Sequence, residues 1–236
     1  MTLIADISQG LIILAVAMAA FVGTHFLLSH ALRRPAIDRF GLAGFRAVYS
    51  AVALVLLLVI FVGYHKTPSG PMLWSSDNLA LQICFAVVGY FAVALFVASL
   101  FANPGLVGSN LNGLSTRAPD GVYLVTRHPM MFAIAIWCVI QVALVPSARN
   151  AISCAGFVLL ALVGARMQDR KNAALSGREW TLWMARTPFW PNLRHIGALG
   201  TIWLLAAIPW VLVSWLETRV TYQPVGLWYF VPDLPF

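Results

Sequence analysis

Six apolar stretches run through this sequence, and each has roughly the length that a helix needs to cross a lipid bilayer. They cover residues 8–31, 44–64, 78–102, 130–146, 151–167 and 198–216. Lipid offers backbone groups no hydrogen-bond partners, so an open chain crosses it only as helix. The stretches also lack the strict alternation of a transmembrane β-barrel. The sequence therefore predicts an all-α fold, a polytopic transmembrane helical bundle of about six spans.

The composition excludes a chain that buries its apolar side chains in one aqueous core. Hydrophobic residues make up 61% of the chain and charged residues 10%, whereas soluble domains carry about 25% charged residues. The first ten residues hold no basic residue and include Asp6, so we expect the first stretch to be a retained span and no cleavable signal. We predict a single integral-membrane domain over 1–236.

The cysteines give no sign of a disulfide framework or a zinc site. Cys84, Cys138 and Cys154 all lie inside apolar stretches, and no Cys-x-x-Cys motif occurs. The sequence also contains no Ser-His-Asp signature, phosphate-binding loop or Rossmann fingerprint. Any chemistry must therefore come from other residues.

The basic residues predict the orientation of the bundle. Most of the 15 lysines and arginines lie in the loops after the first, third and fifth stretches. By the positive-inside rule these loops are cytoplasmic, and both termini face the outer side. The net charge of +7 then reflects orientation in a bilayer, and nucleic acid is not an expected partner. The loop residues are Arg33, Arg34, Arg39, Arg46, Arg117, Arg127, Arg166, Arg170, Lys171, Arg178, Arg186 and Arg194.

Three segments outside the apolar stretches have a character of their own. The cytoplasmic loop 103–120 is rich in Gly, Asn, Pro and Ser and is too long for a minimal turn, which suggests a gate or binding loop. The cytoplasmic segment 168–195 reads as amphipathic, and we expect Trp180 and Trp183 to lie at the membrane interface. The aromatic tail 217–236 is expected to cap the outer face.

His25 is the histidine deepest in an apolar stretch. It lies about 13 Å below the arginines that end the first stretch, at 1.5 Å per helical residue. Ionisable groups at such depth are functional by default. Two interpretations remain open: an imidazole hydrogen-bonded within the bundle, or a proton carrier or metal ligand, haem iron included. His30 lies about 140° around the same helix, so the two do not share a face.

Arg127, His128 and Pro129 stand at the cytoplasmic start of the fourth stretch. Proline suits a first helical turn, and the free N–H groups of that turn attract anions. We expect Arg127 and His128 to hold a carboxylate or phosphate; simple headgroup anchoring is the alternative. Further along, Cys138 and Gln141 share one helix face. Gln141 is an amide that needs a partner, and Cys138 behaves as a small hydrophobe.

Four short motifs, in this order and at these separations, resemble the NnrU family. They are THFLLS at 24–29, FRAVYS at 45–50, VTRHPM at 125–130 and IW at 136–137. The resemblance covers about 21–170. It implies a bacterial inner-membrane protein associated with denitrification and nitric-oxide metabolism, with respiratory or denitrification proteins as expected partners.

The same family includes the 15-cis-zeta-carotene isomerases, which bind haem b and isomerise a carotenoid double bond in a redox-dependent way. The resemblance implies that His25 is a haem ligand and that the substrate is a lipid-soluble small molecule. The second ligand position of those enzymes is Gln141 here, a poor iron ligand. The resemblance implies that Cys138 is an exchangeable ligand that would partly compensate. Gln141 lies about 20 Å from the cytoplasmic face, broadly level with His25. Arg127 and His128 would then hold a haem propionate.

A second resemblance leads to a different activity. Residues 122–129 and 176–180 are similar to membrane methyltransferases of the isoprenylcysteine and phosphatidylethanolamine type. In those enzymes the Arg-His-Pro segment helps to hold S-adenosylmethionine, and a glutamate follows the helical hairpin where this chain has Gln168 and Asp169. A third hypothesis is a non-enzymatic accessory protein for reductase assembly, in which the histidines are structural.

Overall fold

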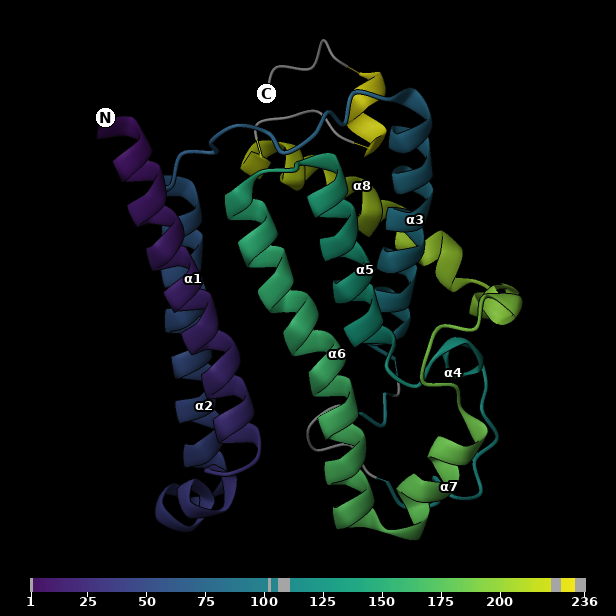
Figure 1. The fold of residues 1–236 in the computed structure, drawn as a ribbon. Helices are drawn as coiled ribbons and strands as arrows, with labels where there is room; N and C mark the ends of the chain where they lie inside the picture. The colour runs from purple at the N-terminus through teal and green to yellow at the C-terminus, as the bar shows by residue number, and fades with distance from the viewer. Residues whose placement is uncertain (1, 102, 106–110, 222–225, 232–236) are drawn as a thin grey trace. The chain divides into compact units, whose positions relative to one another are not determined.

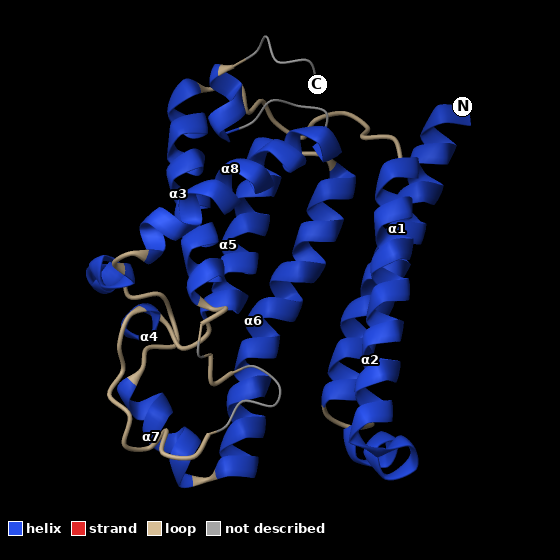
Figure 2. Ribbon diagram, turned by 180° about the vertical axis from the view of Figure 1, so that it is seen from behind, coloured by secondary structure: helices blue, strands red, loops and turns tan. Residues whose placement is uncertain are grey.

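The computed structural model describes residues 2–101, 103–105, 111–221 and 226–231. Every regular element in these ranges is a helix (Figures 1 and 2), so the predicted all-α class is confirmed. The elements are α1 (Thr2–Ser29), α2 (Arg33–Lys66), α3 (Leu79–Ala98), α4 (Val122–Val125), α5 (Pro129–Leu144), α6 (Ala148–Ser176), α7 (Arg178–Arg186), the 3-10 helix η1 (Leu193–Leu199), α8 (Ile202–Thr221) and the 3-10 helix η2 (Gly226–Phe230).

Five helices in the described part of the chain are long and apolar enough to cross a membrane: α1, α2, α3, α6 and α8. The sixth predicted span, α5, is equally apolar but has 16 residues, just below the usual 17 to 25. Its length is set by Pro129 at its start and Pro146 just beyond its end. The chain is therefore a membrane protein, and the outward position of both termini stays a prediction.

Several helices extend beyond the predicted apolar stretches because a helix does not end where lipid ends, and α2 and α6 extend furthest. α2 begins at Arg33 and is broken at Gly41, whose φ of 67° lies in the left-handed region. α6 continues to Ser176, about two turns past the expected end of the span. Gln168 and Asp169 therefore lie on a helix rather than in a loop.

The chain forms two compact units, and each is described by itself. The first unit is Met1–Ser75 with Gln141–Leu160, and the second is Ser76–Ile140 with Ala161–Phe236. The predicted single domain over 1–236 stays a prediction. The predicted outer tail 217–236 is described only for 217–221 and 226–231.

In the first unit, α1 packs along α2 and against the start of α6. Met18 lies directly over Gly156, where a Cβ atom would overlap its side chain, so glycine permits a close helix approach. One turn further, the ring of Phe21 meets the ring of Phe157 edge-on at 5.7 Å. The next residue on this face of α1 is His25.

The end of the first unit at which α2 finishes is tied together by the first turn of α6. The buried Arg149 donates from Nη1 to the carbonyls of Tyr64 (3.2 Å) and Thr67 (2.8 Å), at the end of α2. Asn150 donates from Nδ2 to the carbonyls of Gln141 (2.9 Å) and Val145 (2.8 Å). These bonds satisfy carbonyls that helix ends leave free.

In the second unit, Trp180 and Trp183 lie in the protein core, fully buried. The ring of Trp183 packs against that of Tyr123 at 5.4 Å. The prediction that these two tryptophans face the membrane interface is therefore wrong. α7 buries the face that carries these two tryptophans, but protein covers that face and not lipid.

Candidate functional site

The segment before α5 is extended and is held in place by one side-chain hydroxyl and one backbone N–H. Thr126 has extended dihedral angles, and its hydroxyl donates to the carbonyl of Phe189 at 2.7 Å. The backbone N–H of Arg127 donates to the carbonyl of Pro188 at 2.9 Å. These bonds fix the direction in which the next two side chains leave the backbone.

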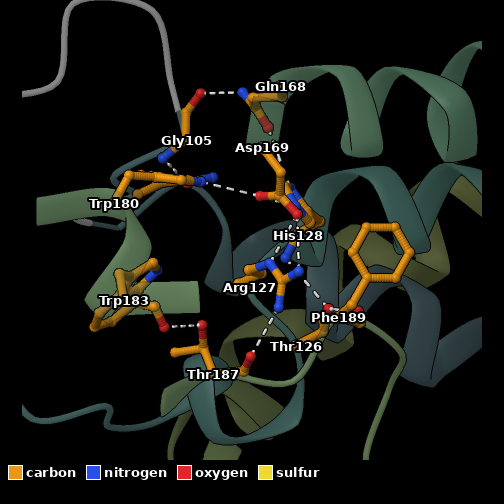
Figure 3. Close-up of polar contacts among 11 residues, drawn as sticks. Gly105, Thr126, Arg127, His128, Gln168, Asp169, Trp180, Trp183, Thr187 and Phe189 are labelled. Atoms are coloured by element: carbon orange, nitrogen blue, oxygen red, sulfur yellow. Dashed lines mark hydrogen bonds and ion pairs between the residues drawn. The ribbon is translucent and has the colours of Figure 1, made fainter. Parts of the chain in front are cut away.

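The side chains of Arg127 and His128 converge on the buried carboxylate of Asp169, on α6 (Figure 3). Arg127 donates to Oδ2 from Nε (2.9 Å) and Nη2 (2.8 Å). Oδ1 accepts from His128 Nε2 (2.9 Å) and from Trp180 Nε1 (3.1 Å). A carboxylate has about four acceptor positions, so Asp169 is saturated by this chain's own donors.

His128 is buried, and both of its ring nitrogens face acceptors. Nε2 faces Asp169, and Nδ1 lies 3.1 Å from Oε1 of Gln168. The amide of Gln168 is oriented by its nitrogen, which donates to the carbonyl of Gly105. Both ring nitrogens are thus engaged by side chains of this chain, so in this arrangement neither is available to ligate a metal.

The sequence predicted that Arg127 and His128 hold a carboxylate or phosphate. In the structure the carboxylate that they hold is Asp169, while the remaining contact of Arg127 runs from Nη1 to the carbonyl of Thr187 at 2.8 Å. The aromatic face of Phe189 lies 5.1 Å from the guanidinium carbon. Sequence reasoning did not pair Asp169 with Arg127 and His128, although an acid at the predicted cytoplasmic end of the fifth span was a usable signal.

The loop 103–120 is fastened to α6 and α7 at both described ends. Besides the bond from Gln168 to Gly105, the carboxylate of Glu179 accepts from the N–H (2.6 Å) and the hydroxyl (2.9 Å) of Ser115. Residues 106–110, where the predicted gate would lie, are outside the described part of the chain. These donors of Ser115 stabilise the charged form, so the pKa of the Glu179 carboxyl is lowered.

We expect this fastening to loosen in acid. Because the pKa of Glu179 is lower in the folded state, its contribution is present above the unfolded pKa, about 4.3, and is lost as pH falls through the folded pKa. Hydrogen exchange at the Ser115 amide, corrected for intrinsic rates, should show full protection above about pH 4.3, the ordinary pKa of a glutamate, and a loss of protection in more acidic solution. The Glu179→Gln protein should lack this loss of protection in acid. The same loss in both proteins would show that the Glu179 carboxylate is not the group that holds Ser115.

His25 lies in the first unit, between α1 and α2. Its Nδ1 lies 2.8 Å from the carbonyl of Phe21, and its ring contacts those of Phe21 (4.3 Å between centroids) and Tyr49 (5.3 Å). A carbonyl only accepts, so Nδ1 is the donor of this hydrogen bond, and Nε2 is the ring nitrogen that the bond leaves for another partner. His30 is exposed, and the distance from its Nδ1 to the carbonyl oxygen of Phe26 is longer, 3.3 Å.

The structure does not bring Gln141 to the level of His25. Gln141 is buried, and its side-chain nitrogen has no partner in the described part of the chain. Its backbone carbonyl accepts from the side chain of Asn150. Phe21 contacts α6 at Phe157, which lies seven residues, or about 10 Å, beyond Asn150 along that helix. His25 lies one helical turn beyond Phe21. Two ligands of one metal ion lie closer than this. Cys138 is a buried free thiol in the second unit.

A search of the described residues finds no group of three or more His, Cys, Asp or Glu side chains that could hold a metal ion. Comparison with known protein families gives one result: the family model described as "NnrU protein" matches residues 13–223. No curated protein and no solved structure matches the chain.

Proposed function

The chain belongs to the NnrU family, and from this premise we propose that it binds haem b through His25. The proposed setting is the bacterial inner membrane, in nitrogen-oxide metabolism beside respiratory or denitrification proteins. The proposed reaction class is a redox-dependent isomerisation of a lipid-soluble substrate.

The observation that carries the proposal is the hydrogen bond between His25 Nδ1 and the carbonyl of Phe21. Metal-ligating histidines almost always donate their other ring N–H to a carbonyl, carboxylate or water, which fixes the ring and presents the second nitrogen. The hydroxyl of Ser29 donates to that of Tyr49 at 3.4 Å, and the Tyr49 ring packs on His25. These contacts orient the imidazole.

The surrounding residues fit a haem held by one protein ligand better than a haem held by two. Gln141 lies at a different level of the bundle, and His128 uses both ring nitrogens within its own unit. Haem held by one histidine would supply a redox-active iron with an open coordination position. His25 would bind the iron, and Phe21 and Tyr49 would limit the contact of the His25 ring with water.

An absorption spectrum tests the proposal. The purified full chain, supplied with haem, should show a Soret band and visible bands that shift on dithionite reduction. His25→Ala should lose these bands, whereas His30→Ala, five residues away on the same helix, should keep them. A spectrum unchanged by His25→Ala would refute the ligand assignment, and no Soret band in the wild-type protein would refute haem binding itself.

Methyl transfer from S-adenosylmethionine is a second candidate. It is favoured by one observation: the α5–α6 hairpin returns Gln168 and Asp169 to Arg127 and His128, within 3.1 Å, where the resembling methyltransferases place a glutamate. Binding of S-adenosylmethionine that weakens in His128→Ala would support this activity. No binding at millimolar cofactor would exclude it. If neither cofactor binds, an accessory role in reductase assembly remains, and co-purification of a reductase subunit would test it.

A further inference from the structure

A groove of about 480 Å³ runs between α1 and α2, wholly within the first unit. Its walls are almost entirely apolar and are formed by Ile13 on α1 and by Val55, Leu58, Val59 and Val62 on α2. Each of these side chains is roughly half exposed. The described part of the chain therefore leaves this groove open.

The length of the groove matches one leaflet of a bilayer. From Val55 to Lys66, both of which line it, α2 advances eleven residues, or about 16 Å. Half of a bilayer's hydrocarbon core is about 15 Å. A groove of this length can take one acyl chain from the membrane midplane to the headgroup region.

The headgroup end of the groove carries a cation. Lys66 is the last residue of α2, is exposed, and has no hydrogen bond or ion pair among the described residues. The neighbouring Thr67 hydroxyl already donates to the carbonyl of Gly63 at 2.7 Å. The ammonium group of Lys66 is thus the group available to an anion at the headgroup level.

We propose that this groove is a binding site for an anionic phospholipid, with one acyl chain along Val55, Val59 and Val62 and the phosphate at Lys66. The arginine distribution predicts that the lipid belongs to the outer leaflet. The site is separate from His25, so the proposal does not depend on haem.

Native mass spectrometry of the full chain in detergent micelles tests the site, with phosphatidylglycerol and phosphatidylcholine as probes. The wild-type protein should bind phosphatidylglycerol more tightly than phosphatidylcholine. Val59→Trp should fill the groove and lower the binding of both lipids at least fivefold. Leu57→Trp is the matched control, because Leu57 is a comparably exposed α2 residue outside the groove, and it should bind as the wild type does.

The charge at Lys66 is tested separately. Lys66→Ala should weaken phosphatidylglycerol binding about fivefold, the factor expected for one basic residue at a membrane surface, and Lys66→Arg should retain it. Equal binding by Val59→Trp and Leu57→Trp would overturn the groove as a lipid site. Loss of lipid in Val59→Trp without any effect of Lys66→Ala would overturn its selectivity for an anionic headgroup.

Discussion

Asp169→Asn is expected to lower the free energy of unfolding by about 3–5 kcal/mol, the usual effect of breaking a buried ion pair by removing one partner. The carboxylate accepts bonds from Arg127, His128 and Trp180 in a buried position. An asparagine would leave the buried guanidinium of Arg127 without its counter-charge and would turn a donor amide toward other donors. The cost is therefore larger than that of a single hydrogen bond.

Unfolding of the detergent-solubilised protein by sodium dodecyl sulfate, followed by tryptophan fluorescence, measures this effect. Asp120→Asn is the matched control, because Asp120 pairs with Arg117 at 3.2 Å in an exposed position. Exposed pairs contribute about 0–1 kcal/mol. Equal, small losses in the two variants would show that the Asp169 cluster is not a stabilising element.

Trp183→Ala is expected to cost about 3–5 kcal/mol as well, through the cavity that it opens in the core of the second unit. Trp183 is fully buried, and its indole nitrogen has no hydrogen-bond partner among the described residues. Trp183→Phe should therefore cost much less, because it keeps most of the packed ring surface and removes an unsatisfied donor.

The same unfolding experiment distinguishes these outcomes. Trp190→Ala serves as the control for loss of a tryptophan, because Trp190 is 57% exposed, and it should change stability little. If Trp183→Phe were as damaging as Trp183→Ala, a hydrogen bond of the indole nitrogen would have to be the main contribution. That result would contradict the packing explanation.

Hydropathy predicted the helical class because lipid leaves a chain few alternatives. It predicted the ends of the helices less well. α2 begins eleven residues before the expected start at Gly44, and α6 continues past Met167 to Ser176. Helices persist in water when capping and side-chain contacts allow, and the apolar pattern that marks a span does not report these contacts.

The site was predicted in part. Proline at the start of a helix, with two cations before it, was enough to select Arg127 and His128. Their partner Asp169 is 42 and 41 residues away, and only the register of the α5–α6 hairpin brings it to them. The environment of Trp180 was predicted wrongly because an amphipathic pattern shows that one helix face will be covered without showing what covers it.

The distance in sequence between His128 and Asp169 also matters while the protein is being made. At about 5–20 residues per second of synthesis, the 41 residues that separate them take roughly 2–8 seconds to emerge. Throughout that interval Arg127 and His128 precede the newly made α5 without their carboxylate. An uncompensated arginine at the entrance of a short apolar helix holds that end back from translocation. Arg127 would thus first set the orientation of α5 and would be paired only later, when the returning helix delivers Asp169.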